Sequence, residues 1–429
     1  MIRRDAHTLL TRRLVSALLG LLPLFAFPDI VAQQSKKALV FRNVDVFDGS
    51  RVIRNTTVIV SDGMIRAVGP DLALPEQAEI VDGKGKTLLP GLIDAHVHLG
   101  LVQGERFLRD AMLFGVTTEL EMWGSEASRE LRDKITRAGI NEIADLRTAG
   151  PGITVPHGHP TQMGGPTFPT LGPNDDIQAF VDARIAEGGD YIKIIYEHRL
   201  PTLTRRQLED VIVAAHRRNR LVVVHTTNQR DAREAVAAGA DGLAHIFADS
   251  SPERDFAKFV AAHKAFVIPT LSVFEALTKT TASHWWDQQP GLTQYITPSM
   301  KGSLEMRFPE GLGGKMQFAN AVAAVAELRR AGVSILAGTD APAPGMAHGI
   351  SLHRELQLLV QAGLTPVEAL AAATSETARG FGFHDRGRIA VGTRADLVLV
   401  NGDPSVDIKK TQDIHGVWKL GVRFSRRSE

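Results

Sequence analysis

The sequence predicts an α/β protein in which a (β/α)8 TIM barrel carries a composite β-sandwich domain formed from both chain ends. The first observation is that strand-like and helix-like runs alternate through residues 88–385. The second is that both ends carry short apolar runs broken by turn signals such as Asp48-Gly49. The third is that residue types able to bind metals follow several central strands, where TIM barrels place their active sites.

Eight strand–helix units can be placed in the central region. The opening strand is the apolar run 88–95, and another run lies near 141–146. The remaining strand-like runs are short and mostly apolar: 116–120, 191–195, 221–225, 242–245, 266–269 and 333–337. Helical patterns lie between them, for example at 179–186, 205–218 and 319–330. A chain of 429 residues is long enough for a barrel-sized domain and a smaller one.

The two ends of the chain share an all-β pattern that differs from the centre. Apolar runs alternate with turn signals through residues 38–87, and the same pattern returns at 387–400 and 417–420. We therefore expect residues 34–87 and 386–429 to form one β-sandwich domain. The barrel domain is expected at 88–385.

Two central stretches depart from the strand–helix repeat. Residues 150–173 are rich in Gly, Pro and His, which is typical of a long loop on the active face of a barrel. Residues 272–314 contain Trp285-Trp286, and this pattern indicates a lid or a substrate-pocket insertion. A disordered linker is the alternative for the second stretch, although its aromatic residues argue against it.

Residues 1–33 have the order of a secretory signal peptide. Arginines precede the apolar run 14–27, and small Ala32 offers a cleavage point. The run is short and contains Pro23, so we expect no stable membrane anchor. Thr11-Arg12-Arg13-Leu14 resembles a twin-arginine signal, and we expect an exported protein, periplasmic or secreted. An uncleaved anchor or a misassigned start codon are the alternatives.

Composition excludes several kinds of chemistry and partner. The 49 basic and 48 acidic residues leave a net charge of +1, which gives no general attraction to nucleic acid or anionic membranes. The chain has no cysteine, so thiolate ligands, disulfides and cysteine nucleophiles are excluded. A bound metal must therefore be held by His, Asp, Glu or a modified Lys.

His96-Val97-His98 closes the opening strand and is the clearest metal-binding signal. Side chains alternate faces along a strand, so these two imidazoles point the same way. Imidazole is a common ligand of zinc, copper, nickel and iron. The pair is therefore half of a metal site, and partners are needed from elsewhere in the chain.

Four further polar residues lie at or near the ends of other central strands. Lys193 lies within an apolar strand, His225 and His245 end theirs, and Asp340 follows the last strand. A single strand-end histidine is usually an ordinary polar group. Six such residues in barrel order indicate one shared site, because the carboxyl ends of barrel strands meet on one face.

With these residues in place, the chain resembles the amidohydrolase superfamily of metal-dependent hydrolases, in a prolidase- or dipeptidase-like or ochratoxinase-like clade. The motifs that carry the resemblance are Pro90-Gly91-Leu92-Ile93-Asp94-Ala95-His96-Val97-His98, Lys193, His225, His245, Gly338-Thr339-Asp340 and Gly392-Thr393-Arg394-Ala395-Asp396-Leu397-Val398. The resemblance covers almost everything after the signal.

The resemblance implies a binuclear centre. His96, His98 and Asp340 would bind one divalent metal, and His225 and His245 a second. Lys193 would be carboxylated and bridge the two, since an unmodified ammonium beside two dications is costly. A mononuclear site with unmodified Lys193 is the alternative. Nitrogen and oxygen ligands favour zinc, with cobalt, manganese or iron also open.

The implied reaction is hydrolysis by a metal-bridging hydroxide, with Asp340 moving the proton to the leaving group. The expected substrate is a small amide: an N-acyl amino acid, a dipeptide or an ochratoxin-like amide. Ester, lactone or phosphotriester hydrolysis is the alternative. A non-catalytic binding protein is disfavoured by the intact ligands, and deamination or imidazolone-ring opening by Lys193. We expect a homo-oligomer, since such barrels often self-associate.

Substrate-binding residues are expected on two loops. Residues 150–160 resemble a loop that places a histidine near the substrate in the related clade. His157 and His159 are the candidates for that histidine in this chain. The family pattern is Gly-Gly-His-Gly, so the Pro156-His157-Gly158-His159-Pro160 sequence does not decide between them. After Lys193, Tyr196, His198 and Arg199 could orient a carbonyl or carboxylate, or could be solvated loop residues.

Overall fold

The computed structural model describes residues 37–100, 103–164, 167–279, 285–288 and 290–426. The predicted signal peptide at 1–33 lies outside the described residues. Within the described residues, no helix combines the length and apolar character needed to cross a membrane. The described chain forms one compact unit.

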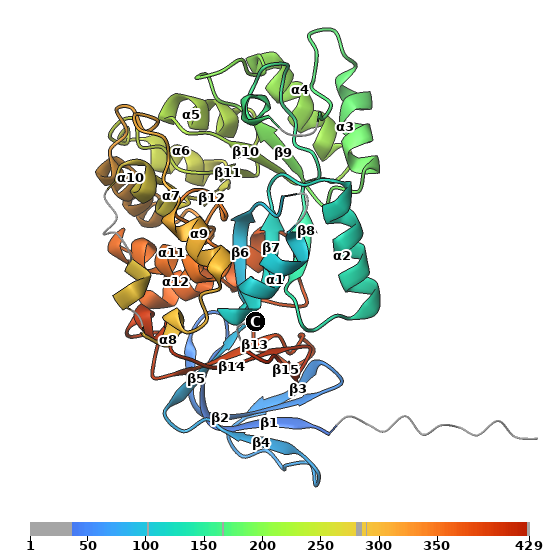
Figure 1. The fold of residues 1–429 in the computed structure, drawn as a ribbon, viewed down its shortest axis with the longest axis vertical. Helices are drawn as coiled ribbons and strands as arrows, with labels where there is room; N and C mark the ends of the chain where they lie inside the picture. The colour runs from blue at the N-terminus through green and yellow to red at the C-terminus, as the bar shows by residue number, and fades with distance from the viewer. Residues whose placement is uncertain (1–36, 101–102, 165–166, 280–284, 289, 427–429) are drawn as a thin grey trace, which may run out of the picture. The chain divides into compact units, whose positions relative to one another are not determined.

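The two ends of the described chain contribute to a single 8-stranded sheet, in the order β15-β14-β13-β5-β1-β2-β3, with β4 paired to β1. Figure 1 shows the blue strands of the first part of the chain beside the red strands of the last part. The strands are β1 (Leu39–Phe47), β2 (Val52–Ser61), β3 (Met64–Gly69), β4 (Glu79–Asp82), β5 (Lys86–Pro90), β13 (Leu397–Asn401), β14 (Ile414–Lys419) and β15 (Val422–Arg423).

Antiparallel pairing of β5 with β13 joins the two ends, with Leu88 opposite Leu399. A buried apolar cluster packs on this sheet, and within it the rings of Phe41 and Trp418 meet edge to face at 4.8 Å. The sheet shows how the ends come together. A β-sandwich of two packed sheets is not confirmed.

The centre holds two parallel sheets. The first runs β6-β7-β8 and the second β12-β11-β10-β9. Their strands are β6 (Leu92–Val97), β7 (Val116–Glu121), β8 (Asp145–Thr148), β9 (Ile192–Ile195), β10 (Val222–His225), β11 (Gly242–Ala244) and β12 (Phe266–Ile268). This is an α/β fold with mixed sheets, consistent with a TIM-barrel-type domain, and the described strands do not form one continuous barrel sheet.

The predicted strand at 333–337 forms isolated bridges in place of a strand. Ile335 bridges Val267, and the amide of Ala95 donates to the carbonyl of Ala337. The amide of Ala337, however, donates to Ala372 at the end of a helix. The ladder is interrupted because this donor is used elsewhere.

Helices flank the central strands (Figure 1). Some helix ends carry standard caps: Thr204 and Gln207 form a capping box at the start of one helix, and Gly139 ends another in the left-handed conformation at φ 58°. The helices are α1 (Gly104–Leu113), α2 (Glu126–Ala138), α3 (Ile177–Ala186), α4 (Arg205–His216), α5 (Gln229–Ala237), α6 (Phe256–Ala262), α7 (Leu271–Leu277), α8 (Pro290–Thr293), α9 (Pro298–Glu305), α10 (Phe318–Arg330), α11 (Ile350–Gln361), α12 (Pro366–Ala372) and α13 (Ser375–Gly380). Short 3-10 helices are η1 (Thr161–Met163), η2 (Trp285–Gln288) and η3 (Ile408–Gln412).

Candidate metal centre

His96, His98 and Asp340 come together at the carboxyl end of β6. The Nε2 atoms of His96 and His98 lie 3.1 and 2.9 Å from Oδ1 of Asp340. One ligand atom of each residue lies within 4.8 Å of the other two. His96 is buried, whereas 36% of the His98 side chain is exposed. The residues expected to hold the first ion therefore form one cluster that solvent can reach from the His98 side.

Asp94 joins the two segments that carry these ligands. Its carboxylate accepts hydrogen bonds from the amide of His96 at 3.1 Å and from the hydroxyl of Thr339 at 2.7 Å. It also accepts from the amide of Thr339 at 3.1 Å. Asp94 lies in the motif quoted above, but no pattern in the sequence reveals that its carboxylate links two distant segments.

The backbone around Asp340 is unusually close to β6. A Cβ at Gly338 would lie 2.9 Å from the Cβ of His96 and 2.5 Å from a side-chain carbon of Ile268, so only glycine fits. Asp340 itself has a φ of 63°, a conformation that side-chain-bearing residues rarely adopt. Such strain is typical of functional positions.

The other predicted ligands lie in the same place. The rings of His245 and His96 have centroids 4.7 Å apart, and so do those of His225 and His245. Lys193 is buried on β9, next to β10, whose last residue is His225. The structure thus brings the four histidines into contact, with Asp340 on one side and Lys193 close enough to influence their charge states.

Burial and neighbouring charges fix the protonation of the cluster. Burial, assisted by Lys193, lowers the pKa of His96 to about 3, and burial lowers the pKa of His245 well below its usual range. Burial alone would raise the pKa of Asp340, but His96 and His98 hold it well below its usual range. Burial also lowers the pKa of Lys193 to about 7, against the charge of Asp340. His96 and His245 are therefore neutral and Asp340 is charged, as metal ligands must be.

Protein contacts leave ligand nitrogens available. Nδ1 of His245 lies 2.7 Å from the hydroxyl of Thr270, and its Nε2 has no hydrogen-bond partner among the described residues. Nε2 of His96 and Nε2 of His98 face Oδ1 of Asp340, the other predicted ligand of the same ion. Neutral imidazoles and a carboxylate that converge in a buried site fit a divalent transition metal such as zinc.

The predicted substrate residues have different surroundings. The ring of His159 stacks on that of His225 at 5.1 Å, next to the cluster. His157 is exposed and, within the described residues, makes no hydrogen bond or ring contact with the cluster. The hydroxyl of Tyr196 donates to Glu234 at 2.5 Å, and Arg199 is paired with Glu197. His159 is therefore the one of these four that contacts a ligand histidine.

Glu197 is a further site residue that the sequence patterns do not reveal. It is buried, and its Oε2 lies 3.0 Å from Nε2 of His225. Its position four residues after Lys193 is the only available signal in the sequence, and that spacing alone assigns no role.

A second group with metal-ligand atoms is internally satisfied. His198, Asp231 and Glu234 have ligand atoms within 4.8 Å of one another. Asp231 already accepts from the amide of His198 at 3.0 Å and contacts its ring nitrogen at 2.7 Å, while Glu234 accepts from Tyr196. These contacts account for the geometry without an ion.

Three known proteins set this site in context. The imidazolonepropionase of Geobacillus kaustophilus (strain HTA426) is 27% identical over 386 residues, which cover 82% of this chain and 84% of that protein. The ochratoxinase of Aspergillus niger is 23% identical over 461 residues, covering 92% and 89%. The crystal structure of a Xaa-Pro dipeptidase with bound methionine shares the fold, with a TM-score of 0.76, 21% identity, and coverage of 91% of this chain and 100% of that one.

The family itself follows from a match that spans most of the chain. Residues 87–423 match the amidohydrolase family, and this range includes all six predicted metal ligands and the strands β13 and β14. The resemblance stated from the sequence motifs is thereby confirmed. The chain belongs to the amidohydrolase family of hydrolytic enzymes.

Proposed function

We propose that this enzyme hydrolyses the C–N amide bond of a small N-acyl amino acid, a dipeptide or a related amide, at a centre of two divalent ions, with zinc expected. The observation that carries the proposal is the cluster of four neighbouring histidines with ionised Asp340 and buried Lys193. Amide substrates fit the names of the ochratoxinase and Xaa-Pro dipeptidase to which the chain is similar.

The residues divide between two ions. His96, His98 and Asp340 would hold the first, and His225 and His245 the second. Lys193, as a carbamate, would contribute an anionic oxygen to each. A pKa of about 7 for Lys193 supports this modification, because only the uncharged amine reacts with carbon dioxide.

The bound ions would supply a hydroxide nucleophile at neutral pH and polarise the scissile carbonyl. Asp340 lies against the first-ion ligands in its ionised form, so its free oxygen can take the nucleophile's proton and pass it to the leaving nitrogen. His159, which stacks on His225, lies next to the reacting atoms and is our candidate to contact the substrate carbonyl.

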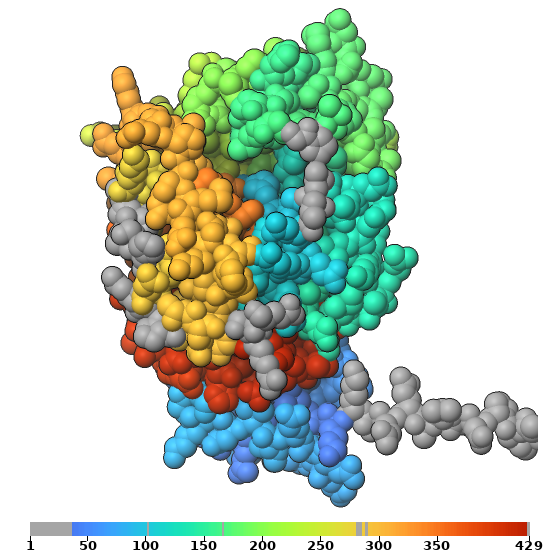
Figure 2. All heavy atoms as spheres, in the orientation of Figure 1, coloured from blue at the N-terminus to red at the C-terminus, as the bar shows by residue number. Residues whose placement is uncertain are grey.

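A cavity against α7 is the candidate to receive the part of the substrate that lies away from the scissile bond. It has a volume of about 350 Å³ and is lined by α7, by the segment from Trp285 to Gly311 and by Pro344, Gly345 and Met346. Figure 2 shows the amber residues of α9 and the segment after it at the surface of the face in view. Ser272, on the cavity wall, lies 3.5 Å from the carbonyl of Thr339, next to Asp340. Ser272 thus links the cavity wall to the segment that carries Asp340.

We further propose that the two central sheets and the 333–337 segment form a closed TIM barrel, with residues 34–87 and 386–429 as a separate β domain. The amide of Ala95 in β6 donates to the carbonyl of Ala337, and the amide of Val267 in β12 donates to the carbonyl of Ser334. These bonds connect the 333–337 segment to both central sheets and support closure of the barrel. We also propose that residues 1–33 direct export and that the enzyme forms a homo-oligomer.

The function is tested with the full chain after reconstitution with zinc. We expect it to hydrolyse N-acyl amino acids or dipeptides, to lose activity with a chelator and to regain it with added metal. Lactones, esters and phosphotriesters form the comparison panel. Turnover confined to lactones or esters would contradict the amide assignment and leave the metal centre intact.

A further inference from the structure

Glu197 lies on the loop after β9 and contacts the Nε2 atom of the predicted ligand His225. Its side chain is 2% exposed, and its Oε2 lies 3.0 Å from Nε2 of His225. An ionised carboxylate can only accept hydrogen bonds, so Nε2 of His225 must carry the proton and donate. Nδ1 is then the ring nitrogen that remains for a metal ion.

His225 differs in this respect from the other histidines of the cluster. His96 and His98 direct Nε2 at Asp340, and His245 has its Nδ1 engaged by Thr270. With its Nε2 bound to Glu197, His225 would use Nδ1 as its ligand atom, whereas the other three would use Nε2. Its tautomer and ring orientation therefore depend on Glu197, as those of metal-bound histidines commonly depend on a neighbouring carboxylate.

Glu197 is itself held in place from several directions. Arg199 pairs with its other carboxylate oxygen, Oε1. The amide of Glu197 donates to the hydroxyl of Thr202 at 3.2 Å, and that hydroxyl donates to the carbonyl of Ile195, the last residue of β9. The ring of His159 stacks on His225 at an interplanar angle of 27°. Two separate contacts thus fix the His225 ring, one at its edge and one at its face.

We propose that Glu197 is a positioning residue that fixes the His225 tautomer and thereby sets the affinity of the second metal ion alone. The inference rests on the proposed two-ion centre. The first-ion ligands are positioned separately, by the bonds of Asp94 to His96 and Thr339. Arg199 acts on this carboxylate as its ion-pair partner.

The test compares metal binding by full-length wild type, Glu197→Ala and Glu197→Gln. Each protein is stripped, titrated with zinc against a chromophoric chelator, and assayed for bound metal by elemental analysis. We expect Glu197→Ala to bind the second ion about 10–100-fold more weakly, with first-ion affinity unchanged. Glu197→Gln keeps an acceptor oxygen without the charge, so its loss should be smaller. Thermal unfolding confirms that each variant is folded.

Asp231→Asn is the matched control. Asp231 is also a buried carboxylate in contact with a histidine, but that residue, His198, lies outside the predicted ligand set. Its substitution should leave both zinc affinities unchanged. Equal weakening of both ions in Glu197→Ala, or no change at either, would overturn the role of Glu197. Wild type that binds fewer than two ions would instead refute the two-ion centre, and the inference with it.

Discussion

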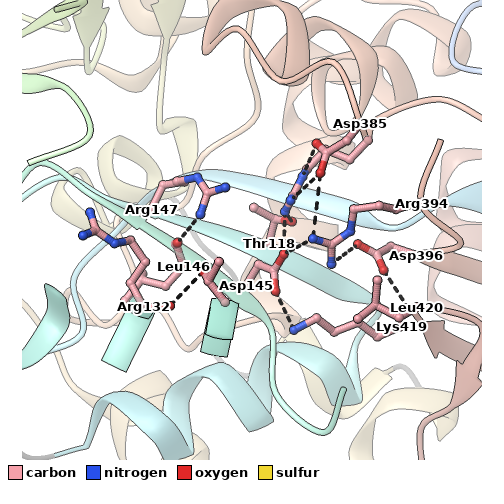
Figure 3. Close-up of polar contacts among 12 residues, drawn as sticks. Thr118, Arg132, Asp145, Leu146, Arg147, Asp385, Arg394, Asp396, Lys419 and Leu420 are labelled. Atoms are coloured by element: carbon pink, nitrogen blue, oxygen red, sulfur yellow. Dashed lines mark hydrogen bonds and ion pairs between the residues drawn. The ribbon is translucent and has the colours of Figure 1, made fainter. Parts of the chain in front are cut away.

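Two buried polar clusters lie at opposite ends of the central strands, and they differ in what completes them. The candidate metal centre follows the last residues of β6, β10 and β11, and its histidines crowd around Asp340. The second cluster surrounds Asp145, the first residue of β8 (Figure 3). There the carboxylate meets Arg386 and Arg394, each at 2.8 Å, and Lys419 at 2.6 Å.

The cluster around Asp145 is neutralised by the chain's own cations. Lys419 is fully buried on β14 and also donates to the carbonyls of Ile140 and Ile143. The cluster therefore joins the last strands of the chain to the start of β8. The metal centre, in contrast, has ligand atoms that face one another without enough donors among them. The charges around Asp145 neutralise one another and link two parts of the fold. The ligand atoms of His96, His98 and Asp340 converge in a way that fits a bound cation.

The largest expected effect is on activity, from Asp340→Asn. The amide cannot take the proton, so kcat should fall by at least about 10²–10⁴-fold. Urea unfolding should be almost unchanged, because Asp340 contributes to the centre and not to the charge cluster. Substantial residual activity in this variant would remove the catalytic role from Asp340.

Asp145→Ala should lower the stability of the protein and leave its metal content unchanged. It leaves buried Lys419, Arg386 and Arg394 without their shared partner, and removal of one member of a buried ion pair costs about 3–5 kcal/mol. We expect the free energy of unfolding in urea to fall by that amount, while zinc stoichiometry of the folded protein stays the same. Loss of metal at unchanged stability would show that the two clusters are coupled.

The stabilisation from Asp145 should also depend on pH. Burial would raise its pKa, but Lys419, Arg394 and Arg386 hold it well below the usual 3.8. A carboxyl with a depressed pKa in the folded state stabilises the fold fully above its unfolded value and loses that contribution as pH falls further. The stability difference between wild type and Asp145→Asn should therefore be constant at neutral pH and narrow below about pH 4. A difference that widens in acid would contradict this assignment.

The smallest expected effect comes from Thr270→Val. The substitution keeps the shape of the side chain and removes the hydroxyl that lies 2.7 Å from Nδ1 of His245. Loss of such a contact weakens metal binding by about 10-fold at the lower end. Zinc titration should locate the loss at the second ion, with the Asp145 cluster and the unfolding free energy unaffected. A larger loss of zinc affinity at the first ion would contradict the assignment of His245 to the second ion.

The predicted metal ligands could be found from the sequence, but the residues that position them could not. His96, His98, Lys193, His225 and His245 could be found because each follows or lies in a recognisable strand. Asp340 could be found because it follows the strand-like run 333–337. Asp94 and Glu197 could not, because their roles depend on hydrogen bonds to residues from other segments. The family was also predictable from the motifs, and the match to residues 87–423 confirms it.

Predictions about the fold were limited by long-range contacts. The apolar run 333–337 predicts a full strand, because the sequence does not reveal that the amide of Ala337 donates to the carbonyl of Ala372 at the end of α12. The run near 141–146 is a strand only from Asp145 onward. Arg386, Arg394 and Lys419 have the appearance of ordinary charged residues in the sequence, and only their approach to Asp145 distinguishes them.

The pairing of β5 with β13 has a consequence for the order in which the protein is made. β5 ends at Pro90, but its neighbour β13 begins only at Leu397, about 300 residues later. Until the ribosome has delivered that strand, one edge of β5 is open to any other extended chain. Synthesis at about 5–20 residues per second leaves this edge uncovered for about 15–60 seconds. β13, one of the last three strands to emerge, is therefore the strand that covers this edge of the first sheet.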